Sequence, residues 1–162
     1  MQDGIVFIDY KKDHELELLS LWRKSFHQAV GIEEDVRQEV IQEHLGFLRS
    51  LNPESIRVAL EKTTNQIAGF MRKEESVIEQ LFVHHEHQRK GLGSRFIQQA
   101  KEESDFLSLS TFELNKGAQQ FYEFHDFVIT GRGFASANDN SWATTREQLA
   151  DITYGWRRSV RR

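Results

Sequence analysis

The sequence predicts one domain of the mixed α/β class, and two features of the chain lead to this prediction. Short apolar runs typical of strands alternate with segments of helical spacing, in the order strand, two helices, three strands, helix, strand, helix, two strands. The chain has 162 residues, of which 38% are hydrophobic and 12 are Phe, so it can bury a sizeable core. No stretch has the composition of a flexible linker. We therefore expect residues 1–162 to form a single domain.

The first third of the chain predicts one strand and two helices. Residues 4–10 are apolar and β-branched, as in a strand. Asp13 offers an N-cap for a helix that ends at Gly31, and its apolar face consists of Leu18, Trp22, Phe26 and Val30. The second helix is expected to open with the acidic residues at 33–35 and to end before Pro53. Its expected buried stripe consists of Val36, Val40, Ile41, Leu45 and Leu48.

The rest of the chain predicts a strand meander followed by alternating helices and strands. Runs 55–61, 66–72 and 76–83 are short, apolar and separated by polar connections, which favours antiparallel pairing. The later elements are expected at 94–103 (helix), 106–114 (strand), a helix capped by Asn115, 128–134 (strand) and 151–157 (strand). The polar stretch 136–147 is too long for a tight turn and is a hypothetical lid.

Composition excludes several classes of protein. The net charge of −4 argues against a nucleic-acid-binding surface, and the absence of Cys excludes disulfides. No apolar run approaches the roughly 18 residues that cross a bilayer. The first ten residues lack a basic segment followed by an apolar run, so a secretory signal is not expected. These features predict a cytoplasmic protein with no membrane partner.

The loop 88–93, Gln-Arg-Lys-Gly-Leu-Gly, has the features of a phosphate site. It connects an expected strand to an expected helix, and unpaired N–H groups at a helix N-terminus attract anions. Glycines let a phosphate approach those groups, and Arg89 and Lys90 add positive charge. A Walker loop is excluded because Ser94-Arg95 follows Gly93, and a dinucleotide fingerprint is excluded because Phe96 occupies its third small position.

The remaining pattern, Gln-x-x-Gly-x-Gly at 88–93, resembles the GNAT superfamily of N-acetyltransferases. The preceding strand ends at Leu81-Phe82-Val83, and the later residues at family spacing are Asn115, Ala118, Phe121 and Tyr122. The resemblance is sharpest over residues 78–127. It implies an acyl-CoA N-acyltransferase fold: a seven-stranded, mostly antiparallel sheet, splayed between strands 4 and 5 and flanked by four helices. One departure is Asp126-Phe127, where the family usually has Gly-Phe.

The resemblance also implies acetyl-CoA as co-substrate and a primary amine as acceptor. In the family the loop binds the pyrophosphate and pantetheine enters the splay, with the Val83 N–H near the thioester oxygen. Asn115 either contacts pantetheine or only caps its helix. The cofactor-binding residues implied are Phe82, Val83, Gln88, Arg89, Lys90, Gly91, Leu92, Gly93, Ser94 and Asn115.

Two residues are candidates for acid–base chemistry. Tyr122 occupies the family's position for a general acid that protonates the departing thiolate, and its alternative is a core aromatic residue beside Phe121. Glu79 is the candidate base, acting through a water, and its alternative is a solvent-facing strand carboxylate. Glu113 on the neighbouring strand is a second candidate.

The acceptor side is expected on the first helix. There the resemblance places Trp22, Phe26 and His27 beside the substrate, although the first two also fit a core face. His84, His85 and His87 are not expected to bind a metal, because an extended loop points alternate side chains apart. His84 has an alternative role in proton transfer. The terminal arginines at 157, 158, 161 and 162 read as a solvated end.

Three classes of function remain open at this point. The first is an enzyme that acetylates an amine of a small molecule or peptide. The second is a non-catalytic acyl-CoA sensor with the same fold, and the third is a nucleic-acid module that uses the arginine-rich tail. The acceptor is not specified, because acceptor pockets form from variable helices and loops. Dimers are common in the family, so a homodimer is a further expectation.

Overall fold

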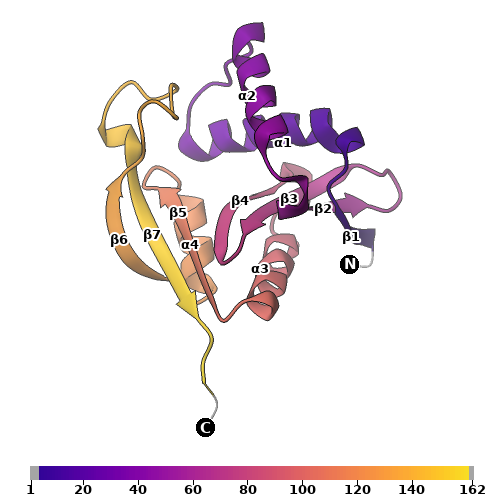
Figure 1. Ribbon diagram of the computed structural model, residues 1–162, viewed down its shortest axis with the longest axis vertical. Coiled ribbons are helices and arrows are strands. Elements are labelled where there is room, and N and C mark those ends of the chain that lie inside the picture. Colours follow the sequence, from indigo (N-terminus) through magenta and orange to yellow (C-terminus); the bar gives the residue numbers. More distant parts are fainter. Residues whose placement is uncertain (1–3, 161–162) are drawn as a thin grey trace.

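A seven-stranded sheet forms the centre of the molecule in the computed structural model, which describes residues 4–160 (Figure 1). Its strands are β1 (Ile5–Asp9), β2 (Ile56–Glu61), β3 (Ile67–Glu74), β4 (Val77–Val83), β5 (Phe106–Phe112), β6 (Val128–Phe134) and β7 (Ala150–Arg157). The strands lie in the order β1-β2-β3-β4-β5-β7-β6. Only β4 and β5 run parallel within the described sheet, and the other neighbours are antiparallel. The predicted mixed sheet is confirmed.

The strands β4 and β5 separate soon after they begin. Their recorded pair is Val77 with Ser108, near the N-terminal end of each strand, and the Ser108 N–H donates to the Ser76 carbonyl at 2.9 Å. Beyond this point the half-sheet β1–β4 diverges from the half-sheet β5–β7–β6 (Figure 1). The expected splay between strands 4 and 5 is therefore present, and it opens toward the C-terminal ends of both strands.

A β-bulge lies in β4 at the level of this splay. Arg72 and Lys73 of β3 pair with Gln80 and Ile78 of β4, so Glu79 between them has no partner on β3. A bulge of this kind bends its strand and re-aims the side chain of the extra residue. The bulge therefore gives the Glu79 side chain an orientation that differs from the regular alternation of side chains between the two faces of the sheet.

Four helices cover the two faces of the sheet (Figure 1). They are α1 (Glu15–Val30), α2 (Gln38–Ser50), α3 (Leu92–Glu103) and α4 (Lys116–Phe124). Leu18 and Leu45 of α1 and α2 pack with Phe70 on one face. On the other face, Phe96 of α3 and Tyr122 of α4 belong to a second buried cluster. Hydrophobic burial on both faces holds the two half-sheets together through their helices.

The predicted N-cap of the first helix, Asp13, is one residue too early, because His14 occupies that position. Asp13 lies in a short 3-10 turn, Lys12–His14, and α1 begins at Glu15 without a side-chain cap. The predicted end is confirmed, since Gly31 adopts a left-handed φ of 75° and closes the helix.

The predicted start of the second helix is also wrong. Glu33, Glu34 and Asp35 form a connection, and α2 begins at Gln38. The buried guanidinium of Arg23 binds this connection: it forms an ion pair with Glu34 at 3.0 Å and donates to the Asp35 carbonyl. Val36 is 71% exposed rather than part of a buried stripe. A tertiary contact to α1 therefore overrides the local preference of these acids for a helix start.

Arg158, just after β7, is bonded to the end of α3. Arg158 donates hydrogen bonds to the carbonyls of Lys101 and Ser104, at 2.6 and 3.1 Å. Arg161 and Arg162 of the predicted basic end lie outside the described residues.

Candidate active site

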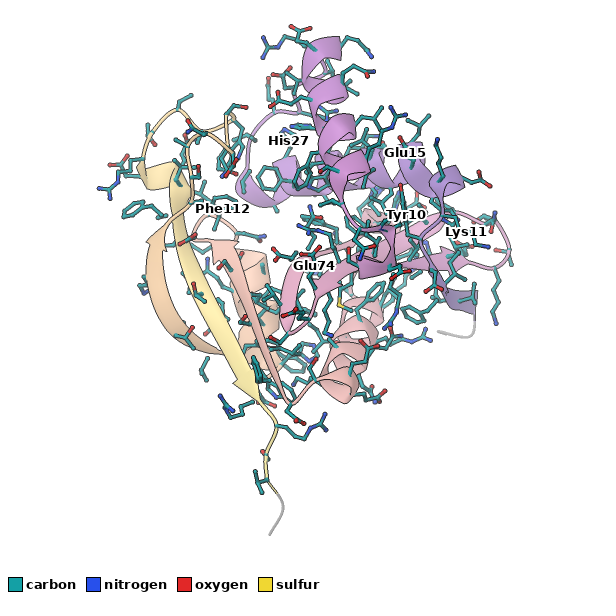
Figure 2. The ribbon with its side chains drawn as sticks, in the orientation of Figure 1. Tyr10, Lys11, Glu15, His27, Glu74 and Phe112 are labelled. Atoms are coloured by element: carbon teal, nitrogen blue, oxygen red, sulfur yellow. The ribbon has the colours of Figure 1, made fainter. Side chains whose placement is uncertain are left out.

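A cavity of about 760 Å³ lies where the splay opens, bounded by β4, β5, α1, α2 and the loop before β7. Seven residues predicted for the site line it: Trp22, Phe26, His27, Glu79, Phe82, Asn115 and Tyr122. Figure 2 shows His27 on α1 and Phe112 at the end of β5 on two sides of this opening. The fold thus brings together the predicted acid, the predicted base and the predicted acceptor side.

Tyr122 presents its hydroxyl to this cavity. The residue is 8% exposed, and burial raises the pKa of its hydroxyl well above its ordinary value near 10. Within residues 4–160 this hydroxyl makes no hydrogen bond, yet its oxygen is not completely buried. Because Tyr122 lines the cavity, we infer that the oxygen faces it. A protonated, unengaged hydroxyl at this point can donate a proton.

Glu79 enters the cavity from the bulge in β4. Its carboxylate lies 3.9 Å from the guanidinium of Arg72, and its side chain is 38% exposed. The Arg72 Nε donates to Gln80 Oε1 at 3.1 Å, which holds the guanidinium along β4. Glu79 is thus a water-accessible carboxylate beside a fixed positive charge. The second predicted base, Glu113, bonds Arg132 at 2.8 Å and does not line the cavity.

The alternation of backbone hydrogen bonds points the Val83 N–H toward the splay. In an antiparallel pair of strands, hydrogen-bonded residue pairs alternate with pairs that are not hydrogen-bonded. The His84 N–H donates to the Ala68 carbonyl at 2.8 Å, so the pairs His84–Ala68 and Phe82–Phe70 are hydrogen-bonded. Val83 lies between them, so its N–H and carbonyl face away from β3. The backbone of Phe82 bonds β3 instead, and its side chain lines the cavity. Only Val83 of these two residues has a backbone N–H available for a ligand in the splay.

The glycine loop follows β4 directly. Gln88 donates from Nε2 to the Val83 carbonyl at 3.0 Å and so ties the loop to the strand end. Arg89 and Gly91 have left-handed φ values of 60° and 83°. The helix α3 then begins at Leu92 with no side-chain cap. Its first N–H groups have no partners inside the helix, which is the arrangement that favours an anion.

Two loop residues have packing roles that the sequence did not indicate. A Cβ on Gly93 would lie 3.1 Å from the ring of Phe121, so this glycine permits the close approach of α3 and α4. The Ser94 hydroxyl bonds His125 Nε2 at 2.9 Å, and burial lowers the pKa of this histidine. For both residues the backbone N–H is the group left to meet a ligand.

The turns at the two ends of α4 behave as the sequence predicts. The Asn115 side chain accepts a hydrogen bond from the Ala118 N–H at 3.1 Å, which confirms the cap, and Asn115 also lines the cavity. Asp126 has a left-handed φ of 69° in the position where the resemblance leads us to expect Gly. The departure from the family pattern therefore keeps the same turn.

The walls of the acceptor side include Arg23 and His44, which sequence reasoning missed, and Trp142, which it placed only in the hypothetical lid 136–147. Trp142 packs edge-on against Phe26 and Phe112, at ring distances of 5.5 and 5.2 Å, so the loop after β6 closes over α1. Arg23, 4% exposed, donates from Nε to His44 Nδ1 at 2.9 Å and links α1 to α2. The spacing of Arg23 and His27, four apart on one helix, was the signal available for this cluster.

The loop histidines do not contribute to the cavity. His84 accepts from the Glu86 N–H at 3.1 Å, and burial lowers its pKa. None of His84, His85 and His87 lines the cavity, and the described residues contain no cluster of three side chains suited to a metal ion. The proton-transfer role considered for His84 gains no support from this position.

Comparison with known proteins identifies the family. Residues 52–129 match the family model described as acetyltransferase (GNAT) domain. The chain carries a GNAT domain. The matched segment runs from before β2 into β6 and includes Glu79, the glycine loop, Asn115 and Tyr122. The acceptor side on α1, α2 and Trp142 lies outside it. No curated protein sequence matches the chain.

Solved structures with the GNAT fold cover nearly the whole chain. Apo-form YjaB from Escherichia coli has a TM-score of 0.71 and 21% identity, over 96% of this chain and 99% of that one. A GNAT-family acetyltransferase from Staphylococcus aureus Mu50 has a TM-score of 0.65 and 19% identity, over 96% and 99%. At these identities the likeness concerns the fold.

A third structure contains a bound co-substrate. It is a protein from Bacillus anthracis str. Ames, provisionally assigned as a streptothricin acetyltransferase and solved in complex with acetyl coenzyme A. The TM-score is 0.52 and the identity 29%, over 64% of this chain and 63% of that one.

Within the described part of the GNAT-containing chain, no helix has the length and apolarity to cross a membrane.

Proposed function

We propose that this chain transfers an acetyl group from acetyl-CoA to a primary amine by direct attack of the amine on the thioester. The observation that carries the proposal is that Tyr122 and Glu79 line one cavity at the splay, while the Val83 N–H at the end of β4 faces away from β3 toward the same splay. The family assignment supports acyl transfer in general. Acetyl-CoA as the donor and a primary amine as the acceptor are the specific parts of this proposal.

The co-substrate would lie along a path defined by this chain's own groups. The first-turn N–H groups of α3 and the Arg89–Lys90 segment would hold the diphosphate. Pantetheine would enter the splay, with the Val83 N–H donating to the thioester oxygen. A preorganised N–H of this kind contributes roughly 10²–10³-fold in rate when charge develops on its oxygen.

Two side chains would manage the protons. Glu79 would take a proton from the incoming amine through a water, since its carboxylate is water-accessible and beside Arg72. Tyr122 would give its proton to the departing thiolate, because burial keeps its hydroxyl protonated. Each such group contributes roughly 10²–10⁴-fold to a rate. The products are an N-acetylated amine and coenzyme A with a free thiol.

An acceptor screen with acetyl-CoA, read as release of free thiol, tests this function. Wild-type protein is expected to release thiol above the hydrolysis background with at least one amine, and Tyr122→Phe is expected to reduce that rate. The second candidate, an acyl-CoA sensor, predicts coenzyme A binding with no amine-dependent thiol release. Release that is equal in wild type and Tyr122→Phe would contradict the proposed mechanism.

A further inference from the structure

One arginine contacts two histidines of the cavity through different atoms. His27 Nδ1 lies 2.5 Å from the main-chain carbonyl of Arg23, and His44 Nδ1 lies 2.9 Å from the Nε of the Arg23 side chain. The two rings lie on different helices, α1 and α2, and both line the acceptor side of the cavity. Arg23 itself is 4% exposed and held by Glu34 and by the Asp35 carbonyl, so it is a fixed reference for both rings.

These contacts require opposite tautomers. A carbonyl oxygen only accepts, so Nδ1 of His27 carries a proton, and in the neutral form of the ring the lone pair lies on Nε2. An arginine Nε–H only donates, so Nδ1 of His44 is bare and its neutral ring carries the proton on Nε2. Burial and the Arg23 charge lower the pKa of His44, which keeps this ring neutral.

Both Nε2 atoms are available to a ligand. Within residues 4–160 neither atom makes a hydrogen bond and neither is completely buried, so both reach accessible space. Because both rings line the cavity, that space is the acceptor side. The cavity therefore offers one hydrogen-bond acceptor, His27 Nε2, and one donor, His44 Nε2–H.

We propose that these two atoms select the acceptor: its amine N–H donates to His27 Nε2, and an oxygen on its body accepts from His44 Nε2–H. The acceptor class is then a primary amine that carries a carbonyl or hydroxyl oxygen, in preference to a plain alkyl or aryl amine. Arg23 is a positioning residue that sets both tautomers. This inference rests on the proposed function, in which the bound amine is the acceptor of the acetyl group.

Paired substitutions separate this role from a structural one. Asn places a polar atom where Nδ1 of His lies, and Gln places one where Nε2 lies. His27→Asn therefore keeps the bond to the Arg23 carbonyl and loses the acceptor in the cavity, whereas His27→Gln restores an oxygen there. We expect His27→Asn to raise the KM for the amine by about tenfold with the KM for acetyl-CoA unaltered, and His27→Gln to recover part of the loss. A purely structural His27 predicts that Asn is the better replacement.

The matched acceptor pair for His44 is phenylalaninamide and 2-phenylethylamine, which differ in one carboxamide. The carboxamide also lowers the basicity of the amine, so rates are compared per neutral amine, and on that scale wild type is expected to favour the amide by about tenfold in kcat/KM. His44→Asn keeps an acceptor for Arg23 but is expected to lose this preference, and His44→Gln is expected to keep part of it. His14→Asn, a histidine outside the cavity, is the control and should behave as wild type. Equal use of the two amines by wild type would overturn the proposal.

Nitrogen NMR of the imidazole rings tests the proposal without turnover. We expect Nδ1–H at His27 and Nε2–H at His44 in the free protein, and shifts at both Nε2 atoms when millimolar phenylalaninamide is added. The reversed tautomers, or no shift at either ring, would overturn it. Calorimetry with coenzyme A reports separately on the proposed function: a chain that binds the amide through both histidines but not coenzyme A would refute that function alone.

Discussion

At the scale of single residues, two buried tyrosines of the same cluster differ in what their hydroxyls meet. Tyr154 is fully buried and donates to Glu123 Oε2 at 2.8 Å, whereas the hydroxyl of Tyr122 opens into the cavity. Their rings lie 6.4 Å apart, so they share the same packing environment. This pair allows packing and acid catalysis to be tested separately.

Tyr122→Phe should lower kcat by roughly 10²-fold or more, because it removes the proposed proton donor and keeps the ring. The dissociation constant for coenzyme A, measured by calorimetry, should stay as in wild type. Tyr154→Phe is the control: it should lower stability by about 1 kcal/mol through the lost hydrogen bond and keep the activity of the folded enzyme. If both variants lose activity equally, Tyr122 is only a packing residue.

Tyr154 also predicts a loss of stability at alkaline pH. Burial, with the hydrogen bond to Glu123, raises the pKa of Tyr154 to about 12, against an ordinary value of 10.0. Above about pH 10 the unfolded chain loses this proton while the folded chain keeps it, so unfolding becomes more favourable. The melting temperature of wild type should therefore fall between pH 10 and 12, and that of Tyr154→Phe should fall less over this interval. Parallel curves would contradict this assignment.

Glu79 and Glu113 form a second matched pair. Glu79→Gln should lower kcat by roughly 10²-fold with little change in the KM for acetyl-CoA, because it removes a base and not a ligand of the co-substrate. Glu113→Gln should retain activity, since Glu113 bonds Arg132 outside the cavity. Steady-state kinetics of both variants decide between the two carboxylates. A loss confined to Glu113→Gln would move the base to the neighbouring strand.

At the scale of elements, α3 and α4 pack closely where Gly93 of α3 lies against the ring of Phe121 of α4. Gly93→Ala should lower stability by about 1–3 kcal/mol, because its Cβ would press on the ring of Phe121 at 3.1 Å. The double variant Gly93→Ala with Phe121→Leu should recover part of that stability, measured by urea unfolding. If the double variant recovers stability but still binds coenzyme A weakly, Gly93 also serves the diphosphate. An unaltered stability in Gly93→Ala would contradict the packing role.

The elements that were predicted correctly have local causes. Gly31 ends α1 through its left-handed φ and Asn115 caps α4 through the Ala118 N–H, and each of these depends on nearby residues alone. The failures have distant causes. The start of α2 is set by Arg23, which lies on another helix, and the bulge at Glu79 appears only when β4 is paired with β3. Single-sequence periodicity contains no such information.

At the scale of the whole molecule, the two halves of the site differ in how far the sequence predicts them. The co-substrate half depends on one strand, one loop and one helix that follow each other directly, so a short motif predicts it. The acceptor half brings Trp142 against α1 and α2, which lie far earlier in the sequence. All three lie outside the matched family segment. Its walls follow from packing of the complete fold, and this is why Arg23 and His44 were not predicted.

The central claim is that residues 88–94 bind the diphosphate of coenzyme A through their backbone N–H groups, and calorimetry tests this claim most directly. Purified chain should bind coenzyme A with a measurable heat and should lose affinity for it at high salt. Pantetheine, which lacks the diphosphate together with the 3′-phosphoadenosine, should bind much more weakly. The absence of any heat with millimolar coenzyme A, or equal affinity for pantetheine, would contradict the claim.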